Sequence, residues 1–459
     1  MKKILIILIT LFGVMQTFYA QNKQILYGFD EIPQTLLLNP GAVTNYKYHA
    51  GIPLLSNISS NLGITGITLA DVFRNDGVNF TAKYREALNK LSENDYVQIN
   101  SQIEVLNAGY KLNDRDYITA GFYLEMDAFA TIPKDILSLI NNGNASNVNR
   151  SFSLSQANVK SEFIGVLHVG ISRRLNPKIT FGSRLKIYSG AVNVTTSGNS
   201  GSFTTRLGQD NIYSHYLNNI NIAGNTSGVY YENNESNISA GKLLGKTFLG
   251  GNLGVGLDIG FTYKLNNQTE ITASLLDLGF ISYSEDVRNG SINGDFVFSG
   301  IEFQYDATNP DYWGELDSQF REQVPREENK ESYTVARPIK FNSSIKHSWG
   351  KSRKEENCHD ISYNDYFDNA IGAQFFSVIR PNGPKFALTG FLEKRVFESV
   401  KGKVTYTIDD FSYTNFGLGI SAKLGKVNVY GMLDNLFKIT DIADANQASF
   451  QVGVNLIFK

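Results

Sequence analysis

The sequence contains many stretches of nine or more residues in which apolar side chains alternate with polar or small ones. In 253–265, LGVGLDIGFTYKL places leucine, valine, isoleucine and aromatic residues on one side of an extended chain, and glycine, aspartate, threonine and lysine mainly on the other. Residues 416–424 and 450–458 repeat the pattern. This period of two predicts β-strands with two different faces, and strands of this length can cross a membrane at a tilt.

The connections between these stretches alternate in length. Short links at 112–116, 175–178, 265–268 and 424–426 are interleaved with long ones near 64–96, 128–160, 191–251 and 283–337. Outer-membrane barrels have short periplasmic turns and longer outer loops. We therefore expect an all-β fold, a transmembrane antiparallel β-barrel of about 14 strands with short helices in the outer loops. The strands are expected near 48–62, 98–112, 117–127, 162–174, 178–190, 252–265, 269–282, 338–349, 369–380, 385–397, 403–409, 416–424, 427–437 and 448–458.

Two segments fit this scheme less well. Asp295–Asp306 has the pattern of a strand, but a fifteenth spanning strand would give an odd total and reverse every later turn. We therefore place it in an outer loop. The linker from Gly350 to Asn369 is long where a short turn is expected.

The last stretch, FQVGVNLIFK, predicts the strand that closes the barrel. Closure leaves no unpaired sheet edge in lipid, where an unsatisfied backbone group is costly. Its apolar face also resembles the signal by which barrel-assembly machinery recognises its clients. The residues of this expected assembly signal are Phe450, Val452, Val454, Leu456 and Phe458.

The first residues predict a secretory signal peptide over 1–20. Lys2 and Lys3 precede an apolar run from Ile4 to Met15, and cleavage is expected after Ala20. The run is too short to span a bilayer as a helix, and the lack of a cysteine near the cut argues against a lipid anchor. We assign 21–47 to an N-terminal periplasmic segment and 48–459 to the barrel.

Composition excludes several classes of function. The formal charge of −2 becomes −4 without the two leader lysines, with 40 basic against 44 acidic residues, so nucleic acid is not an expected partner. Cys358 is the single cysteine, which excludes disulfides within the chain. With neither a phosphate loop nor a catalytic motif, we expect no cofactor, no metal and no enzyme activity.

Two local groupings have a chemical alternative. His168 and Ser172 share the polar face of one strand, but four residues correspond to roughly 13 Å along a strand, beyond the hydrogen-bond reach of a nucleophile and its base. Cys358-His359-Asp360 lacks the spaced partners of a metal site and is read as a polar turn.

Charged and polar side chains on the inner faces of the expected strands are the candidate functional residues. Buried charges are tolerated when they are paired or hydrated, so either a paired interior or a narrow wet channel is consistent with their mixed signs. The expected lumen-facing residues are Tyr123, Glu125, Asp127, His168, Arg184, Lys186, Asp258, Lys264, Lys340, Lys346, Glu393, Arg395, Lys403, Lys423 and Asp434.

The outer loops carry helical patterns. Phe80, Tyr84, Leu88 and Leu91 share one helical face, Pro133–Ile140 predicts a short helix, and Asn309-Pro310 begins another that contains Trp313. These helices either fold onto the barrel rim or offer a hydrophobic binding surface for a ligand or partner.

Several motifs resemble a family of uncharacterised outer-membrane barrels. They are LNPG at 38–41, HAGIPLLSNIS at 49–59, IPKDILSLINNGNAS at 132–146, RLKIYSGAVNV at 184–194 and LDNLF at 433–437. That family is itself distantly similar to the FadL fatty-acid transporters and to the PorV and PorP/SprF barrels of type IX secretion systems. The resemblance implies a FadL-like barrel of fourteen strands in which the N-terminal segment 21–47 is a plug, and it transfers no activity.

Two classes of function remain. The first is FadL-like uptake of small hydrophobic compounds through a plugged barrel, with a hydrophobic small ligand as its partner. The second is a non-transporting accessory or scaffold barrel, with a component of a secretion or surface-assembly complex as its partner. Under both, the expected location is the cell outer membrane, with its lipid around the barrel.

Overall fold

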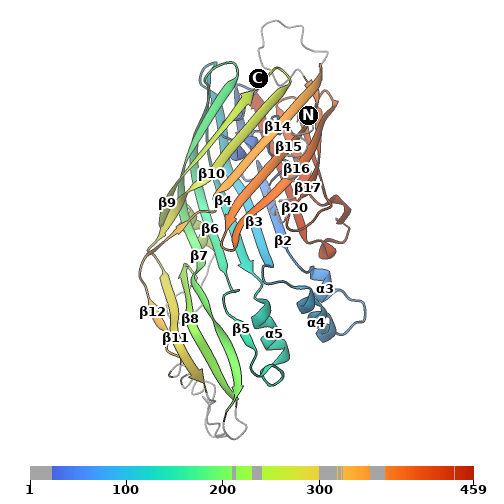
Figure 1. The fold of residues 1–459 in the computed structure, drawn as a ribbon. Coiled ribbons are helices and arrows are strands. Elements are labelled where there is room, and N and C mark those ends of the chain that lie inside the picture. Colours follow the sequence, from blue (N-terminus) through green and yellow to red (C-terminus); the bar gives the residue numbers. More distant parts are fainter. Residues whose placement is uncertain are drawn as a thin grey trace, which may run out of the picture.

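The structure is a computed structural model that describes residues 23–208, 213–229, 240–298, 318, 322, 324–351, 367–438 and 440–458. Its strands form a closed antiparallel barrel of 14 strands, which confirms the expected fold class. Figure 1 shows the barrel standing upright, with a smaller sheet and helices below it. The expected signal peptide lies outside the described residues.

Each predicted strand has a counterpart in the barrel. In chain order these are β1 (Tyr48–Gly51) with β2 (Ile58–Ile64), β3 (Tyr96–Lys111), β4 (Asp116–Thr131), β6 (Val159–Arg174), β7 (Ile179–Leu207), β9 (Asn252–Lys264), β10 (Thr269–Tyr283), β13 (Tyr333–Ala336) with β14 (Lys340–Lys351), β15 (Phe367–Arg380), β16 (Gly383–Phe397), β17 (Val400–Ile408), β18 (Asn415–Leu424), β19 (Val427–Leu433) and β20 (Gln447–Phe458).

Short asparagine turns define one end of the barrel, which we call the turn end; the opposite end is the loop end. In three of these turns the side chain of Asn113, Asn176 or Asn266 accepts hydrogen bonds from the backbone N–H groups two and three positions later, at 2.8–2.9 Å. Asparagine favours such turns because its side chain mimics a backbone turn. A Leu-Asn pair at the end of a strand therefore favours a tight turn, after which the chain runs back as the next strand.

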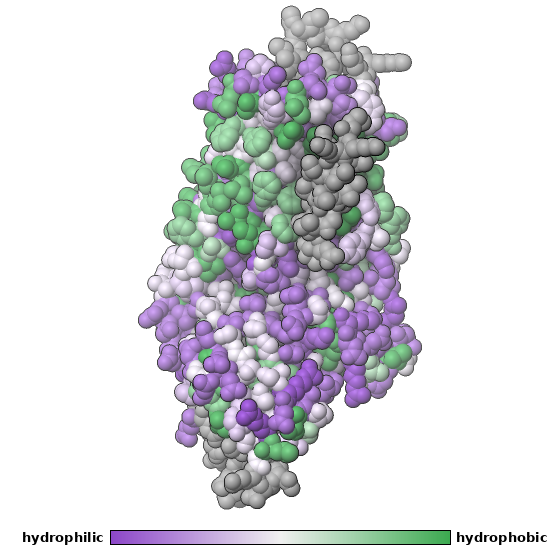
Figure 2. Space-filling model, viewed as in Figure 1, coloured by the Kyte–Doolittle hydropathy of each residue, from purple (hydrophilic) through white to green (hydrophobic). Residues whose placement is uncertain are grey.

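The two faces of each strand separate as the alternation predicts. On β9, Leu253 and Val255 are 49% and 56% exposed on the outer wall, whereas Asp258 is fully buried inside. Figure 2 shows apolar residues gathered on the upper, turn-end half of the visible surface, with mainly polar residues below. An apolar outer band of this kind matches the hydrocarbon layer of a membrane.

The first strand corrects the prediction of a continuous strand over 48–62. It breaks at 52–57, where Pro53 has no N–H to donate and Leu54 has a left-handed φ of 63°. Leu54 and Leu55 are half exposed on the outside, while Ser56 and Asn57 are fully buried. Both parts of the strand still pair with β20 and β3.

A second correction concerns the long outer segments, which contain a sheet of their own. Strand β7 runs past the barrel to Leu207 and pairs there with β8 (Tyr213–Ser227), which pairs with β11 (Val287–Phe298); β12 (Glu327–Asn329) and β5 (Ser151–Ser153) complete this sheet. It hangs below the barrel in Figure 1. The described part of Asp295–Asp306 lies in β11, outside the barrel, as predicted.

Short helices occupy the plug region and the loop end. They are α2 (Thr35–Leu38), α3 (Leu69–Phe73), α4 (Phe80–Lys90), α5 (Lys134–Asn142) and α6 (Ala240–Thr247), with 3-10 turns η1 (Ala145–Asn147), η4 (Leu436–Lys438) and η5 (Ile442–Asp444). The helices predicted at 80–91 and 133–140 are confirmed, and Trp313 lies outside the described residues. Across the described ranges, no helix is long and apolar enough to cross a membrane.

The closing role of the C-terminal strand is confirmed. Strand β20 pairs with β19 on one side and with β1 and β2 on the other, with Tyr48 opposite Phe458 and Ile58 opposite Val452. The rings of Tyr48 and Phe458 stack, with centroids 4.5 Å apart. The first and last strands are therefore held together at the turn end by backbone and ring contacts.

Leu257→Arg should destabilise the barrel by about 2–4 kcal/mol, because it places a cation on the outer face near the middle of the apolar band. Reversible unfolding in lipid vesicles measures the loss. Asn267→Arg, in an exposed turn, is the matched control and should change the unfolding free energy little. Equal losses in the two variants would show that the outer face is wrongly assigned.

Phe458→Asp should reduce insertion strongly, because it removes the stack with Tyr48 and charges the strand that must be captured before the barrel closes. Heat-modifiable gel mobility and protease protection report insertion. Phe73→Asp, on an exposed face of α3, provides the control. Normal assembly of Phe458→Asp would rule out the terminal strand as the expected assembly signal.

Candidate functional site in the barrel lumen

The predicted lumen-facing residues fall into two groups. Twelve are buried: Tyr123, Glu125, Asp127, His168, Arg184, Lys186, Asp258, Lys340, Lys346, Glu393, Lys403 and Asp434. The other three, Lys264, Arg395 and Lys423, are half-buried and lie near the turn end of their strands. Most of the buried ones contact other charged residues of the wall or the N-terminal segment, so the polar residues of the lumen form connected groups.

Eight charged side chains form one continuous series of ion pairs, which we call the charge chain. Its members, in order of contact, are Arg184, Asp258, Lys186, Asp277, Lys340, Glu125, Arg337 and Glu162. Basic and acidic groups alternate along it, and each sign occurs four times. The charge chain is therefore neutral as a unit, which is the condition for burying so many charges.

The charge chain crosses the lumen. Lys340, on β14, contacts Asp277 of the neighbouring β10 at 2.9 Å and Glu125 of β4 at 3.3 Å, although β4 and β14 are not adjacent in the barrel. Arg337, immediately after β13, reaches Glu125 at 3.0 Å and also pairs with Glu162 of β6. Opposite walls are thus braced by charge-assisted hydrogen bonds, which are the stronger kind.

Two irregularities place Asp277 and Arg337 inside. Strand β10 shifts register between Leu275 and Leu278, where Asp277 has a left-handed φ of 61°. The facing strand is interrupted between β13 and β14, where Pro338 follows Arg337. Bulges commonly re-aim a side chain in this way. A strict period of two misses both residues, so the sequence prediction did not include them.

Further ion pairs fill the rest of the wall. Arg380 forms a two-pronged contact with Asp127. Glu393 contacts Lys401 at 2.8 Å and Lys403 at 3.5 Å. Of the two interpretations left open by the sequence, the described part of the lumen has the paired interior.

Residues 23–46, which we call the plug segment, lie inside the barrel. Wall side chains donate to its backbone carbonyl groups: Lys403 Nζ to Tyr27 at 2.6 Å, Arg184 to Leu37 at 3.1 Å, and Ser274 to Leu38 at 2.6 Å. The plug segment forms no pairing with a barrel strand. Its exposed carbonyls are therefore satisfied by the lumen wall itself.

Small wall residues make room for the plug segment. A Cβ added at Gly182 would lie 2.0 Å from the carbonyl oxygen of Pro40, and one at Gly260 would lie 2.1 Å from Asn39. Side chains of this segment also form an apolar cluster with the wall; its members are Ile25, Leu26, Phe29, Ile32, Tyr430 and Met432. Glycine in these strands permits the close approach of a second backbone.

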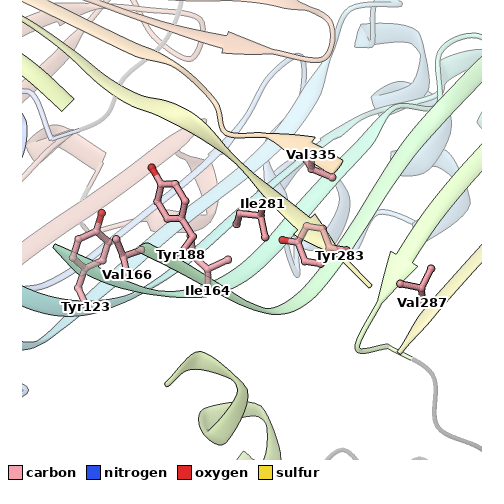
Figure 3. Packing of buried hydrophobic residues seen from close by; sticks show 8 residues of the cluster. All are labelled: Tyr123, Ile164, Val166, Tyr188, Ile281, Tyr283, Val287 and Val335. Carbon is pink, nitrogen blue, oxygen red and sulfur yellow. The ribbon is translucent and has the colours of Figure 1, made fainter. Parts of the chain in front are cut away.

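A second apolar cluster lines the lumen toward the loop end. Figure 3 shows its residues, Tyr123, Ile164, Val166, Tyr188, Ile281, Tyr283, Val287 and Val335. Leu37 of the plug segment packs against it. The guanidinium of Arg337 lies 5.3 Å from the ring centre of Tyr188, so the cluster is continuous with the charge chain.

Three cavities beside the plug segment are small. They lie at Asp30, Lys23 and Tyr27 and have volumes of about 30, 20 and 10 Å³ respectively. Such volumes hold about one or two water molecules. In this state the plug segment and the charge chain occupy the space that a solute would need.

His168 and Ser172 are not hydrogen-bonded to each other. His168 packs against the Tyr123 ring at 5.7 Å, and its ring nitrogens have no hydrogen-bond partner. Ser172 donates instead to the Ala42 carbonyl at 3.2 Å. Within the described ranges, no group of three His, Cys, Asp or Glu residues is arranged for a metal ion. Cys358 and its neighbours lie outside those ranges.

Replacing Arg337 by methionine should cost about 3–5 kcal/mol of unfolding free energy, because it leaves Glu162 buried without its cation. Denaturant unfolding in lipid measures this. Arg326→Met, which removes a half-exposed pair with Glu328, should cost at most about 1 kcal/mol.

A double variant, Arg337→Met with Glu162→Gln, should recover part of the loss, since no unpaired charge then remains at that end. Equal stabilities for Arg337→Met and Arg326→Met would contradict a bracing role for the charge chain.

Comparison with known proteins finds a family whose function is unknown. A model described as a family of unknown function, DUF5723, matches residues 40–434. This confirms the resemblance to a family of uncharacterised barrels. No curated protein matches the chain.

Solved structures with a similar fold include hydrocarbon transporters. The toluene transporter TbuX of Ralstonia pickettii is 10% identical over 95% of this chain and 99% of its own, with a TM-score of 0.41. A FadL homologue of Pseudomonas aeruginosa is 9% identical over 97% and 100%, with a TM-score of 0.46. The translocator domain of the Neisseria meningitidis autotransporter NalP is 8% identical over 90% and 89%, with a TM-score of 0.31. At these values the similarities carry no functional argument.

Proposed function

Since this chain belongs to the DUF5723 family of unknown function, we propose a function from its own geometry: it is a barrel of the outer membrane that takes up small hydrophobic compounds past its plug segment. Support for the location comes from the closed sheet and the apolar outer band. A closed sheet leaves no strand edge unpaired, which lipid demands of a spanning β-structure.

The observation that carries the uptake proposal is the way the plug segment is bound. It fills the lumen without joining a strand, so it can shift while every backbone bond of the wall stays intact. It is held by side-chain hydrogen bonds, including the pair between Gln34 and Asn455, by two charged contacts at the turn end and by two apolar clusters, one around Phe29 and one around Leu36. A segment held in this way is suited to move when a solute passes.

The charged contacts at the turn end form a latch. Asp30 lies 2.5 Å from the ammonium of Lys346, and Glu31 lies 3.1 Å from the guanidinium of Arg395. Lys346 also contacts Glu270 at 2.7 Å. The latch thus consists of the ion pairs that join Asp30 and Glu31 of the plug segment to the wall. Its removal frees the part of the plug segment that lies nearest the turn end.

The apolar cluster around Tyr123, Tyr188 and Tyr283 favours hydrophobic solutes. Its side chains lie toward the loop end, next to Leu37 of the plug segment. When the plug segment moves, this cluster loses a partner and exposes apolar surface inside the barrel. An apolar solute that covers this surface removes it from water again, which stabilises the complex by roughly 25 cal/mol per Å² of apolar surface buried.

A second function is favoured by a different observation. The charge chain braces opposite walls, and the described cavities hold little more than a water molecule each. A barrel whose interior serves stability in this way fits an accessory or scaffold subunit of a secretion or surface-assembly complex. A stable partner protein in native co-purification would support this second function.

A reversible tether on the plug segment tests uptake. Gln34 and Asn455 exchange two amide hydrogen bonds, each of 2.9 Å. In a Cys358→Ser background, Gln34→Cys and Asn455→Cys are joined by a short, reducible bifunctional thiol reagent. Uptake of the apolar dye N-phenylnaphthylamine by intact cells should be lost on tethering and regained on reduction, because the plug segment can move again.

The single-cysteine variants are the controls, and the reagent should leave their uptake unchanged. Weakening the latch with Asp30→Asn and Glu31→Gln should raise uptake, whereas Asp114→Asn, in an exposed turn, should not. If the tethered and reduced proteins pass the dye equally, the plug-gated route is wrong and the accessory function gains support.

A further inference from the structure

The connection between β17 and β18 folds into the mouth of the barrel at the loop end. Within residues 409–414, which we call the strap, Phe411 is 6% exposed. Its ring centre lies 5.6 Å from that of Tyr96, which in turn packs on Phe129 at 5.0 Å. A Cβ at Gly63 would lie 2.5 Å from the Phe411 ring. The strap thus covers lumen-lining residues of β2, β3 and β4.

Asp410 ties the strap to two further wall residues. Its carboxylate accepts a hydrogen bond from the Tyr96 hydroxyl and lies 3.5 Å from the ammonium of Lys385 on β16. That ammonium sits 4.4 Å from the centre of the Tyr96 ring. Tyr96 of β3 and Lys385 of β16 therefore meet at the same carboxylate and hold the strap together.

Asp409, the first residue of the strap, is buried. It is 1% exposed, and its Oδ1 accepts the backbone N–H groups of Phe411 at 3.0 Å and Ser412 at 2.9 Å. Its Oδ2 has no hydrogen-bond partner. An unpartnered carboxylate oxygen in a buried site is costly when ionised and tolerable when protonated.

The charged groups around Asp409 do not favour its ionised form. Asp410 within the strap and Asp434 after β19 act on it as like charges. Asp95, which precedes β3, and Lys385 on β16 interact with the neighbouring Asp410. At the end of β15, Arg380 is already paired with Asp127.

We propose that the strap is a pH-dependent gate at the loop end, closed while the Asp409 carboxyl keeps its proton and released when that proton leaves. The proton goes to solvent, and the carboxylate then faces Asp410 and Asp434 without a compensating cation of its own. Opening moves it into water and carries Phe411 away from Tyr96. This gate is separate from the plug segment and does not depend on what the barrel carries.

The direction of the pH effect follows from linkage. Burial raises the pKa of Asp409 from 3.8 to about 7 in the closed strap, and an exposed aspartate returns to its ordinary value. The closed form therefore holds a proton that the open form releases. Opening becomes easier as pH rises from about 4 to about 7 and levels off above 7, with a total effect of at most about a thousandfold.

Hydrogen exchange of the intact barrel in lipid nanodiscs tests the gate. Peptides covering 409–414 report the Phe411 and Ser412 amides, and rates are corrected for the intrinsic pH dependence of exchange. Protection should fall between pH 4 and 7 and then stay constant. Asp409→Asn keeps an acceptor oxygen for both amides but cannot ionise, so its protection should hardly change over this range.

A second variant leaves the strap itself untouched. Asp434→Asn removes one of the facing acids, so the midpoint of the wild-type change should move to lower pH. Asp114→Asn, in an exposed turn, should leave the wild-type profile as it is. A flat wild-type profile, or one that Asp409→Asn reproduces, would overturn the gate.

Discussion

Backbone hydrogen bonds in a medium without water are the constraint on which the rest of this structure depends. Lipid offers no partner to an unpaired N–H or C=O group, so the sheet must close. Closure rests on β20, which pairs with β19 on one side and with β1 and β2 on the other. Once the wall is closed, half of every strand's side chains must fit inside it.

The space inside the wall is filled by charged side chains and by the N-terminal region of the chain. The charge chain is acceptable in a buried lumen because basic and acidic groups alternate along it. The plug segment brings backbone carbonyls that satisfy wall donors such as Arg184 and Lys403. Two kinds of contact thus fill the barrel, ion pairs between strands and hydrogen bonds onto the plug segment.

Much of the fold was predictable because apolar and polar residues alternate with a period of two in a strand that has one apolar and one polar face. The alternation located each strand of the barrel and the inward side of residues such as Asp258 and Lys186. It failed where the wall is irregular. Asp277 and Arg337 lie at a bulge and a strand break, and the break at Pro53 interrupts a strand that was expected to be continuous. The sheet formed by β8 and β11 was also missed, since strand pairing outside the barrel depends on partners far apart in sequence.

The central claim is that the plug segment and the charge chain keep this barrel closed. Current through single barrels in a planar bilayer tests it most directly. We predict no steady current for the intact protein, and brief openings at most, because the plug segment lies in the lumen and the three cavities beside it hold only a water molecule or two. A constant ohmic current, as through an open water-filled pore, would contradict this account.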